Sequence, residues 1–584
     1  MTRRVLLLLA ASAAVIAAAP VTVERGVKVI MRDTTVLRAD IYRPGVDGRF
    51  PILLQRTPYD KRNGATFGYR AAAAGYVVII QDVRGRYTSE GEWYPFRSES
   101  QDGYDTVEWA AALPYSNGQV GMFGGSYVGA TQMLTAIAHP PHLAGICPVV
   151  TASNYHNGWT YQGGAFQQWF NESWTSGLAQ DTLNRKVQSA TNAKEGIWKL
   201  PLTSYPLFNM TAGSLQLGSP EVLAPYFLDW LAHPSYDEYW KRWSIEEHYP
   251  DIRVPALHVA AWYDIFQGGA LRNYEGIKAH GGTEAARNGQ HLLVTIGGHA
   301  GSGRQIGDVD FGLAAEQYQE DTVTLEWYDY LFKGVKNHFS QKPVRIFVMG
   351  ANQWRDENQW PPERMRETRF FLHSERGANS LRGDGALSTQ APDSESSDHY
   401  VYDPANPVAT IGGPLCCDAE HLAAGPRDQR PDEARDDVLI YSMKPFDRDV
   451  EATGPVHVEL FAKSSAVDTD FAAKLVDVWP NGFARNLTEG IVRARYRNSQ
   501  ERPELLNPGQ IYKFAIDLWS TSNVFQKGHQ LRIEISSSNF PRFDRNLNTG
   551  ADAEFEGRYV SATNTIYHDA EHPSAILLPI VEAK

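Results

Sequence analysis

Apolar and polar positions follow different patterns along the chain, and the first pattern predicts an α/β domain. In residues 20–150 and 251–340, continuous apolar runs rich in β-branched residues alternate with helical stretches. Such runs are typical of strands buried on both faces of a parallel sheet. The expected strands are Pro51–Arg56, Tyr76–Gln81, Gln119–Phe123, Val254–Trp262 and His291–Ile296, and the expected helices are Gly68–Ala74, Asp102–Ala112 and Leu313–Phe332. This alternation predicts a mainly parallel sheet covered by helices.

Residues 151–250 interrupt that pattern. Phe166–Leu178, Thr182–Asn192 and Ser235–Glu247 have helical character, and no strand alternates with them. We therefore expect residues 151–250 to form a helical cap over the carboxyl edge of the sheet.

The pattern of residues 341–584 changes again, to short alternating runs separated by Pro, Gly, Asn and Asp. Many short strands with turn signals between them are typical of a sandwich or jelly roll, so we expect a jelly-roll β-sandwich here. The expected strands include Val344–Met349, Glu367–Leu372, Val438–Ser442, Val456–Ala462, Phe471–Val478, Gln510–Leu518 and Gln530–Ser536. At 584 residues the chain exceeds the size of one hydrophobic core, which agrees with several domains.

Residues 1–19 have the pattern of a secretory signal peptide. Arg3 and Arg4 precede the apolar run Val5–Ile16, and three alanines, Ala17–Ala19, follow it. This run is shorter than the roughly 20 residues of a membrane span. We expect export to the periplasm or the medium and no membrane span after removal of the signal; an uncleaved N-terminal anchor is the alternative.

Charge and composition restrict the partners. The formal net charge is −13 and no block of Lys and Arg stands out, so a nucleic acid partner is not expected. No His and Cys spacing predicts a metal site, and no cofactor is expected. Gly297–Gly303 lacks the Lys-Ser/Thr ending of a phosphate-binding loop. A small molecule is the expected partner, and a homo-oligomer is left open.

The odd number of cysteines, three, argues against a disulfide framework. Adjacent cysteines rarely bond each other, since the geometry is strained. A bridge from Cys147 to Cys416 or to Cys417 is possible, and the sequence leaves that pairing open.

The clearest candidate for chemistry is Ser126, in GMFGGSYVGATQML. It lies at a strand-to-helix junction, and glycines beside it leave room for the sharp turn that exposes a nucleophilic hydroxyl. The strict G-x-S-x-G spacing is not met, because Val128 takes the last position and Gly129 follows. The motif alone therefore fits a plain turn equally well.

A serine hydroxyl needs a histidine base and an orienting carboxylate to become nucleophilic. Asp264 follows the strand ending at Trp262, and His299 follows the strand His291–Ile296, so both lie at the carboxyl edge where open α/β sheets bind ligands. The order serine, acid, histidine is that of α/β-hydrolases. We therefore predict that Ser126, Asp264 and His299 form a catalytic triad.

These residues carry a resemblance to a known family. RTPYDK, QDVRGRYTSEGEW, GMFGGSYVG, the Trp-Tyr-Asp-Ile-Phe segment, GGHAG and GPxDQRxxE together resemble the cocaine esterase / X-prolyl dipeptidyl-peptidase family across the mature chain. The resemblance implies an α/β-hydrolase core, a helical cap and a C-terminal jelly roll. It implies Ser126 as nucleophile, His299 as base and Asp264 as orienting acid. It also implies an oxyanion hole formed by the Tyr59 hydroxyl and the backbone N–H of Tyr127.

The resemblance also points to a substrate pocket formed by Trp159, Trp174 and Phe266, although these rings fit cap–core packing equally well. The sequence departs from the family at two places. Gly298 stands where the family often has Trp, and Phe266 and Gln267 stand where α-amino acid ester hydrolases carry acids that hold the substrate ammonium. Cationic α-amino substrates are therefore disfavoured.

Three functions compete at this point. The first is hydrolysis of carboxylic esters through an acyl-enzyme on Ser126. The second is amide hydrolysis by the same groups, as in a glutaryl-cephalosporin acylase or an X-prolyl dipeptidyl-peptidase. The third is a carbohydrate-binding jelly-roll protein with an inactive hydrolase domain, and the complete set of Ser126, Asp264 and His299 argues against it.

Overall fold

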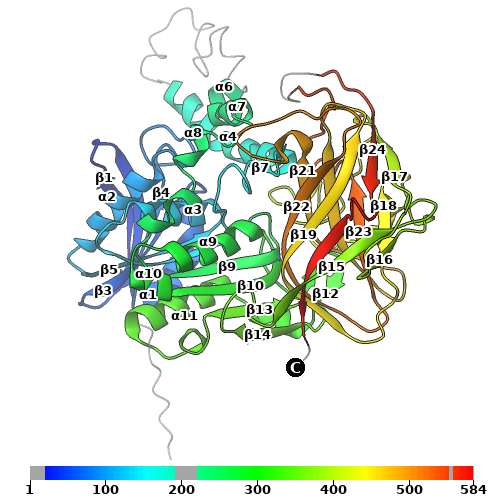
Figure 1. Cartoon of the computed structure of the whole chain (residues 1–584). Helices are drawn as coiled ribbons and strands as arrows, with labels where there is room; N and C mark the ends of the chain where they lie inside the picture. Colours follow the sequence, from blue (N-terminus) through cyan, green and yellow to red (C-terminus); the bar gives the residue numbers. More distant parts are fainter. Residues whose placement is uncertain (1–19, 191–219, 552–556, 583–584) are drawn as a thin grey trace, which may run out of the picture.

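The structure, a computed structural model, describes residues 20–190, 220–551 and 557–582 (Figure 1). The signal peptide expected at residues 1–19 and the last two residues of the predicted helix Thr182–Asn192 lie outside these ranges. The described chain forms a helix-covered sheet, a cap of helices above it and an all-β domain beside it (Figure 1). No helix in these ranges combines the length and the apolar character that a membrane crossing requires.

The first domain is built on a ten-stranded sheet in the order β1-β2-β4-β3-β5-β6-β9-β10-β13-β14. The strands from β4 to β13 in this order are parallel, and β1, β2 and β14 pair antiparallel at the two ends. Their bounds are Val21–Ile30, Val36–Pro44, Val77–Asp82, Phe50–Thr57, Ser116–Gly125, Leu143–Val149, Ala256–Tyr263, Gln290–Gly298, Val344–Val348 and Gln353–Glu357. The apolar runs fill the central strands because both faces of these strands are covered.

One expected strand was placed in the wrong sheet. Val344–Met349 was expected to begin the β-sandwich at residue 341, but β13 pairs in parallel with β10 and belongs to the first sheet. The antiparallel strand β14 then closes that edge. A short apolar strand has the same pattern in either sheet, so sequence periodicity does not distinguish the two.

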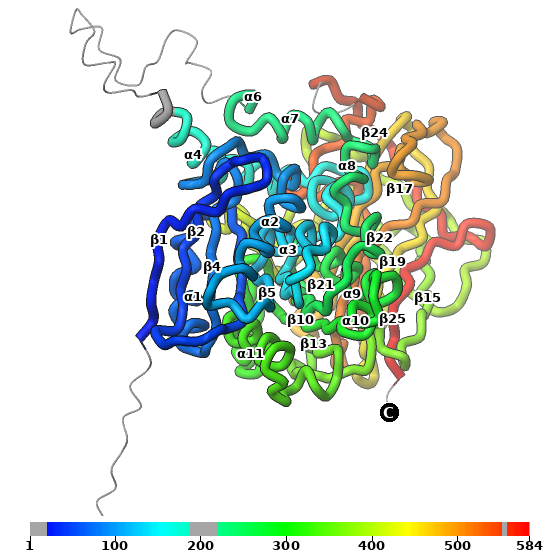
Figure 2. Tube along the Cα trace, turned by 90° about the vertical axis from the view of Figure 1, so that its left-hand side faces the viewer, coloured from blue at the N-terminus to red at the C-terminus, as the bar shows by residue number. Residues whose placement is uncertain are grey.

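Helices cover both faces of this sheet. Side chains of α2 (Glu99–Ala111), α3 (Tyr127–Ile137) and α9 (Gln267–His280) pack into one apolar cluster, and those of α1 (Ala65–Ala73) and α11 (Glu320–Lys333) into another. Figure 2 views the sheet from the side of α2, α3 and α9. The connecting loops at the carboxyl ends of the strands face the cap.

The cap contains one long helix, α4 (Gln168–Ala190), where two helices were expected. Short elements complete it: β7 (Tyr161–Gln162), β8 (Ala165–Phe166), α6 (Pro220–Leu223), α7 (Pro225–Ala232), α8 (Glu238–Lys241) and the 3-10 turn η4 (Glu246–Asp251). The helix expected at Ser235–Glu247 is reduced to the single turn of α8. Around it the chain folds over buried rings, among them Trp240 and Trp243, which face other aromatic side chains of the cap.

The strands of the all-β domain form one hydrogen-bonded network of eleven strands in the order β17-β24-β19-β25-β15-β16-β18-β23-β20-β21, with β22 paired to β19. The strands are Met365–His373 (β15), Ala386–Ser388 (β16), Asp398–Tyr402 (β17), Leu439–Ser442 (β18), Val450–Ser464 (β19), Asp470–Val478 (β20), Ala484–Arg493 (β21), Tyr512–Phe525 (β22), Gln530–Ser536 (β23), Ala562–Tyr567 (β24) and Ala575–Val581 (β25). The short strand β16 lies within the polar stretch 374–397.

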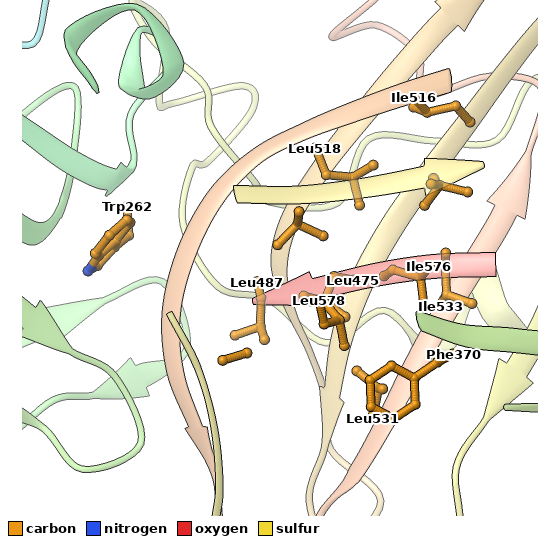
Figure 3. Close-up of a cluster of buried hydrophobic side chains, with 14 of the residues drawn as sticks. Trp262, Phe370, Leu475, Leu487, Ile516, Leu518, Leu531, Ile533, Ile576 and Leu578 are labelled. Carbon is orange, nitrogen blue, oxygen red and sulfur yellow. The ribbon is translucent and has the colours of Figure 1, made fainter. Parts of the chain in front are cut away.

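The all-β domain and the sheet domain share a hydrophobic core. Trp262 of β9 belongs to the same buried cluster as Leu487, Ile533 and Leu578 of the all-β domain (Figure 3). Polar contacts reinforce the junction, because the Tyr263 hydroxyl donates to the carbonyl of Asn486 at 2.8 Å. The two domains are therefore packed as one body, with loops of both near the cap.

Candidate active site

Ser126 lies in the sharp turn between β5 and α3. Its φ of 61° lies in the left-handed region that residues other than glycine seldom adopt, and its N–H donates to the carbonyl of Val149 at 2.9 Å. Gly124 before it has a φ of 118°, and a Cβ there would lie 2.5 Å from a methyl carbon of Val128. A strained backbone at a functional site holds a side chain in a fixed direction.

The shifted glycine of the motif has a packing explanation. A Cβ at Gly129 would lie 2.8 Å from Cβ of Thr151, so the glycine lets α3 pass close to the chain that follows β6. Val128, at the position where the strict motif has glycine, is itself buried. The close approach is made one residue later along α3 than the strict motif requires.

The structure brings Ser126, His299 and Asp264 together in one hydrogen-bonded chain. Oγ of Ser126 lies 2.9 Å from Nε2 of His299, and Nδ1 of His299 lies 2.6 Å from Oδ2 of Asp264. Asp264 is fully buried, and its other oxygen accepts the N–H of Phe266 at 2.7 Å. A buried carboxylate bonded on both oxygens fixes the orientation of the imidazole, as a serine nucleophile requires.

Each of the three comes directly after a strand. Ser126 follows β5, Asp264 follows β9 and His299 follows β10. Because these strands are parallel and lie within the run β5-β6-β9-β10 of neighbouring strands, their carboxyl ends meet at one edge. The three residues that the sequence places after separate strands therefore meet at the same edge of the sheet.

Tyr59 follows β3 at the same edge, and its hydroxyl faces Ser126 and the backbone N–H of Tyr127. Trp174 of α4 donates its indole N–H to this hydroxyl at 2.9 Å. Burial raises the pKa of Tyr59, so the phenol is protonated and can donate at neutral pH. Arg86, fully buried, donates to the carbonyls of Pro58 and Leu178, both at 3.0 Å, and so ties the Tyr59 loop to the cap.

The backbone N–H of Tyr127 opens helix α3, where amide hydrogens have no acceptor within the helix. The side chain of Tyr127 is fully buried and fixes this turn: its hydroxyl donates to Glu99 at 3.0 Å and accepts the N–H of Phe96 at 2.8 Å. Tyr59 and Tyr127 thus present one hydroxyl and one amide hydrogen beside Ser126. Two such donors are the arrangement that stabilises an oxyanion.

A pocket of about 770 Å³ opens at Ser126. Trp174 lines it, as expected, together with Leu178 of the same helix. Trp159 and Phe266 were also expected to line the pocket, and the structure places them elsewhere. They stack on each other with centroids 4.3 Å apart and are fully buried, and the Phe266 ring lies nearly perpendicular to the His299 ring with centroids 5.2 Å apart. They support the site by packing behind it.

The sequence did not indicate the opposite wall of the pocket. It is formed by the β11–β12 hairpin (Gln305–Ile306 and Val309–Asp310) and by a loop of the all-β domain that contains Leu415, Leu422 and Gly425. The nearby GPxDQRxxE stretch begins at the end of this loop, and it was the only sequence signal there. The all-β domain therefore contributes directly to the pocket.

The cysteine pairing differs from both expected alternatives. Cys416 and Cys417 are bonded to each other, and Cys147 is a free buried thiol on β6. Cys147 cannot bridge to either of them, because it is enclosed within the sheet domain whereas the other two lie on the pocket wall. Burial raises the pKa of the Cys147 thiol. Within the described ranges no group of three or more His, Cys, Asp or Glu side chains is arranged to hold a metal ion.

The comparisons agree with this geometry. Residues 33–301 match the X-Pro dipeptidyl-peptidase (S15 family) model, and residues 337–577 match the X-Pro dipeptidyl-peptidase C-terminal non-catalytic domain. The chain is 38% identical to the cocaine esterase of Rhodococcus sp. (strain MB1 Bresler), over 96% of this chain and 99% of that protein.

Solved structures show the same architecture over the whole length. An α-amino acid ester hydrolase superposes with a TM-score of 0.78 at 25% identity, covering 98% of each chain. An aminopeptidase from the marine sediment archaeon Thaumarchaeota archaeon superposes with a TM-score of 0.80 at 24% identity, covering 100% of this chain and 99% of the other. With its triad geometry, domain plan and sequence relatives in agreement, the chain belongs to the cocaine esterase / X-Pro dipeptidyl-peptidase (S15) family of serine hydrolases.

Proposed function

We propose that this enzyme hydrolyses carboxylic esters whose acyl and alcohol groups are neutral and apolar. The observation that carries the proposal is the lining of the pocket at Ser126, which contains no Asp, Glu, Lys or Arg among the described residues. Apolar side chains such as Trp174, Leu178, Leu415 and Leu422 form much of its wall. A charged substrate group would lose its hydration here without gaining an ion pair, which is unfavourable.

The reaction follows from the hydrogen-bond geometry. Oγ of Ser126 attacks the ester carbonyl while its proton passes to Nε2 of His299, and Asp264 stabilises the imidazolium. The tetrahedral oxyanion accepts hydrogen bonds from the Tyr59 hydroxyl and the Tyr127 N–H. His299 then protonates the departing alkoxide and leaves an acyl-enzyme.

Hydrolysis of the acyl-enzyme reverses these roles. His299 takes a proton from water, the resulting hydroxide attacks the acyl carbon, and the proton returns to Ser126 as the acid departs. Because the same groups cleave amides, the triad does not define the leaving group. The absence of a charged group from the described lining favours neutral esters over α-amino substrates and over glutaryl amides.

A substrate panel tests the proposal. We expect p-nitrophenyl butyrate to show a kcat/KM at least about 100-fold above those of glycyl-prolyl-p-nitroanilide and glutaryl-p-nitroanilide, since a buried unpaired charge costs several kcal/mol. Faster turnover of either charged amide would overturn the proposal. A fluorophosphonate probe should label the wild type and not Ser126→Ala; an unlabelled wild type would argue for a protein that binds without catalysis.

We also infer that the protein is exported. The basic start, the apolar run Val5–Ile16 and the small residues before Pro20 support this inference. Sequencing the N-terminus of the protein recovered from the periplasm or the medium should find a start close to Pro20. An intact Met1 on membrane-associated protein would instead support an uncleaved anchor.

A further inference from the structure

A loop of the all-β domain, residues 414–424, closes one side of the active-site pocket. Its base is fixed by Gly413 and Gly425, which exchange two backbone hydrogen bonds of 2.8 and 2.9 Å. Just beyond the base, the carbonyl of Pro426 accepts the N–H of Asp308 at 2.9 Å, and Arg427 pairs with Asp308 at 2.7 Å. The loop is therefore anchored at its base to the β11–β12 hairpin of the sheet domain.

The Cys416–Cys417 disulfide lies in this loop and lines the pocket together with Ser126 and Trp174. Cys416 is partly buried and packs against the apolar cluster beneath the cap, whereas Cys417 is exposed. The two cysteines thus form part of the wall of the pocket that a bound ester meets. The same exposure gives a small thiol reagent access to the disulfide from solvent.

The disulfide also fixes the backbone of this part of the loop. Cys417 has a φ of 79°, in the left-handed region that is unfavourable for side chains other than glycine. Hydrogen bonds within the loop connect Asp418 with His421 and Leu422, which follow the cysteine pair in the chain. Breaking the sulfur–sulfur bond would remove the covalent constraint between Cys416 and Cys417 while Cys417 occupies this unfavourable conformation.

We propose that the Cys416–Cys417 disulfide is a redox-sensitive, specificity-determining element of the ester pocket. In the oxidised form, it presents a fixed apolar wall against the larger group of the substrate. In the reduced form, the wall consists of two independent thiols and no longer holds a large group in place. This proposal rests on the ester-hydrolysing function proposed above.

The reduction is a simple thiol–disulfide exchange. A small dithiol attacks one sulfur, the sulfur–sulfur bond breaks, and the mixed disulfide is resolved by the second thiol of the reagent. The enzyme gains two S–H groups with two electrons and two protons, and the dithiol becomes a cyclic disulfide. Exchange with an oxidised dithiol or oxidised glutathione restores the original wall.

Catalysis itself does not depend on the disulfide. The contacts among Ser126, His299 and Asp264 are made entirely by loops of the sheet domain. A small ester that occupies only the space beside Ser126 does not need the loop. Reduction should therefore change the discrimination between large and small esters and leave turnover of the small ester unchanged.

The experiment compares p-nitrophenyl acetate with p-nitrophenyl octanoate before and after treatment of the full-length enzyme with dithiothreitol. Native alkylation with iodoacetamide and mass spectrometry should show two modified cysteines, Cys416 and Cys417, after reduction. We expect KM for the octanoate to rise at least fivefold and kcat for the acetate to change less than twofold. Oxidised glutathione should reverse the effect.

Two variants separate the possible causes. Cys416→Ser/Cys417→Ser should behave like the reduced enzyme and not respond to dithiothreitol, whereas Cys147→Ala should respond like the wild type. An unchanged octanoate KM in the reduced enzyme or in the double-serine variant would overturn the proposal, and so would a disulfide that dithiothreitol does not reduce in the folded enzyme. If neither ester is hydrolysed by the untreated enzyme, the proposed function fails instead.

Discussion

The indole N–H of Trp174 donates a hydrogen bond of 2.9 Å to the Tyr59 hydroxyl, so a cap residue holds the group that faces the nucleophile. Because the phenol oxygen accepts from Trp174, its own hydrogen is free to point toward the substrate oxyanion. A donor whose oxygen already accepts a hydrogen bond is also polarised toward stronger donation. In the proposed mechanism, the cap would therefore position the oxyanion donor Tyr59 as well as shape the pocket.

Tyr59→Phe removes this oxyanion donor and keeps the ring. We expect kcat to fall about 100-fold or more with little change in KM, because the interaction forms mainly in the transition state. Steady-state kinetics with a p-nitrophenyl ester measures both parameters. An unchanged kcat would exclude Tyr59 from the mechanism.

Trp174→Phe preserves much of the pocket wall but removes the indole N–H. Loss of one neutral hydrogen bond is worth about 1 kcal/mol, so kcat should fall about 3- to 10-fold. In a Tyr59→Phe background the same change should have almost no further effect on kcat, because its partner is already absent. Independent effects in the double variant would contradict the proposed link between the two side chains.

Asp264→Asn keeps the shape of the side chain and removes its charge. We expect kcat to fall by about 10⁴, because the amide does not hold the productive imidazole tautomer. Asp251→Asn is a matched control, since that carboxylate lies at the opposite end of β9 and pairs with His248. Circular dichroism should show both variants folded, and comparable losses of activity in the two would contradict the assignment of Asp264.

A pH-dependent contribution to stability is expected from His568 in the all-β domain. Burial opposes its charge, but Asp398 at 2.9 Å and Glu395 at 3.2 Å hold the pKa of His568 above its usual value. A raised pKa in the folded state stabilises the protein fully below the unfolded pKa of about 6.5, and this stabilisation disappears as pH rises through the folded pKa.

His568→Gln should therefore cost stability mainly at low pH. We expect the difference in urea midpoint between wild type and variant to be larger at pH 6 than at pH 8.5. His399→Gln, which changes an exposed histidine of β17, serves as the control. A gap that widens at high pH would mean that His568 is not charged in the folded protein.

The sequence predicted the triad because each of its members follows a strand with a strong apolar pattern. The carboxyl ends of parallel strands meet wherever the strands lie in the sheet, so Asp264 and His299 could be placed beside Ser126 without knowing the full strand order. The family resemblance supplied the Tyr59 hydroxyl and the Tyr127 backbone N–H, because neither role has a local sequence signature.

Contacts between distant segments were not predictable in this way. Trp159 and Phe266 fit a pocket wall or a packed core equally well by sequence, and only their stacking decides between these possibilities. The loop at Leu415 reaches the pocket because two domains share a core, which no periodicity reveals. The bond between Cys416 and Cys417 was not expected, because adjacent cysteines rarely form a disulfide.

The loop anchored at Gly413 and Gly425 also sets the point during synthesis at which the pocket can be completed. Ser126, Asp264 and His299 all leave the ribosome before the all-β domain begins. A nascent chain synthesised through Glu357, the end of β14, therefore carries every triad residue and all strands of the first sheet, but it lacks the pocket wall formed by residues 414–424 and the partner surface for Trp262. The lining of the pocket is thus completed only after residues 414–424 have been synthesised, well after the triad residues.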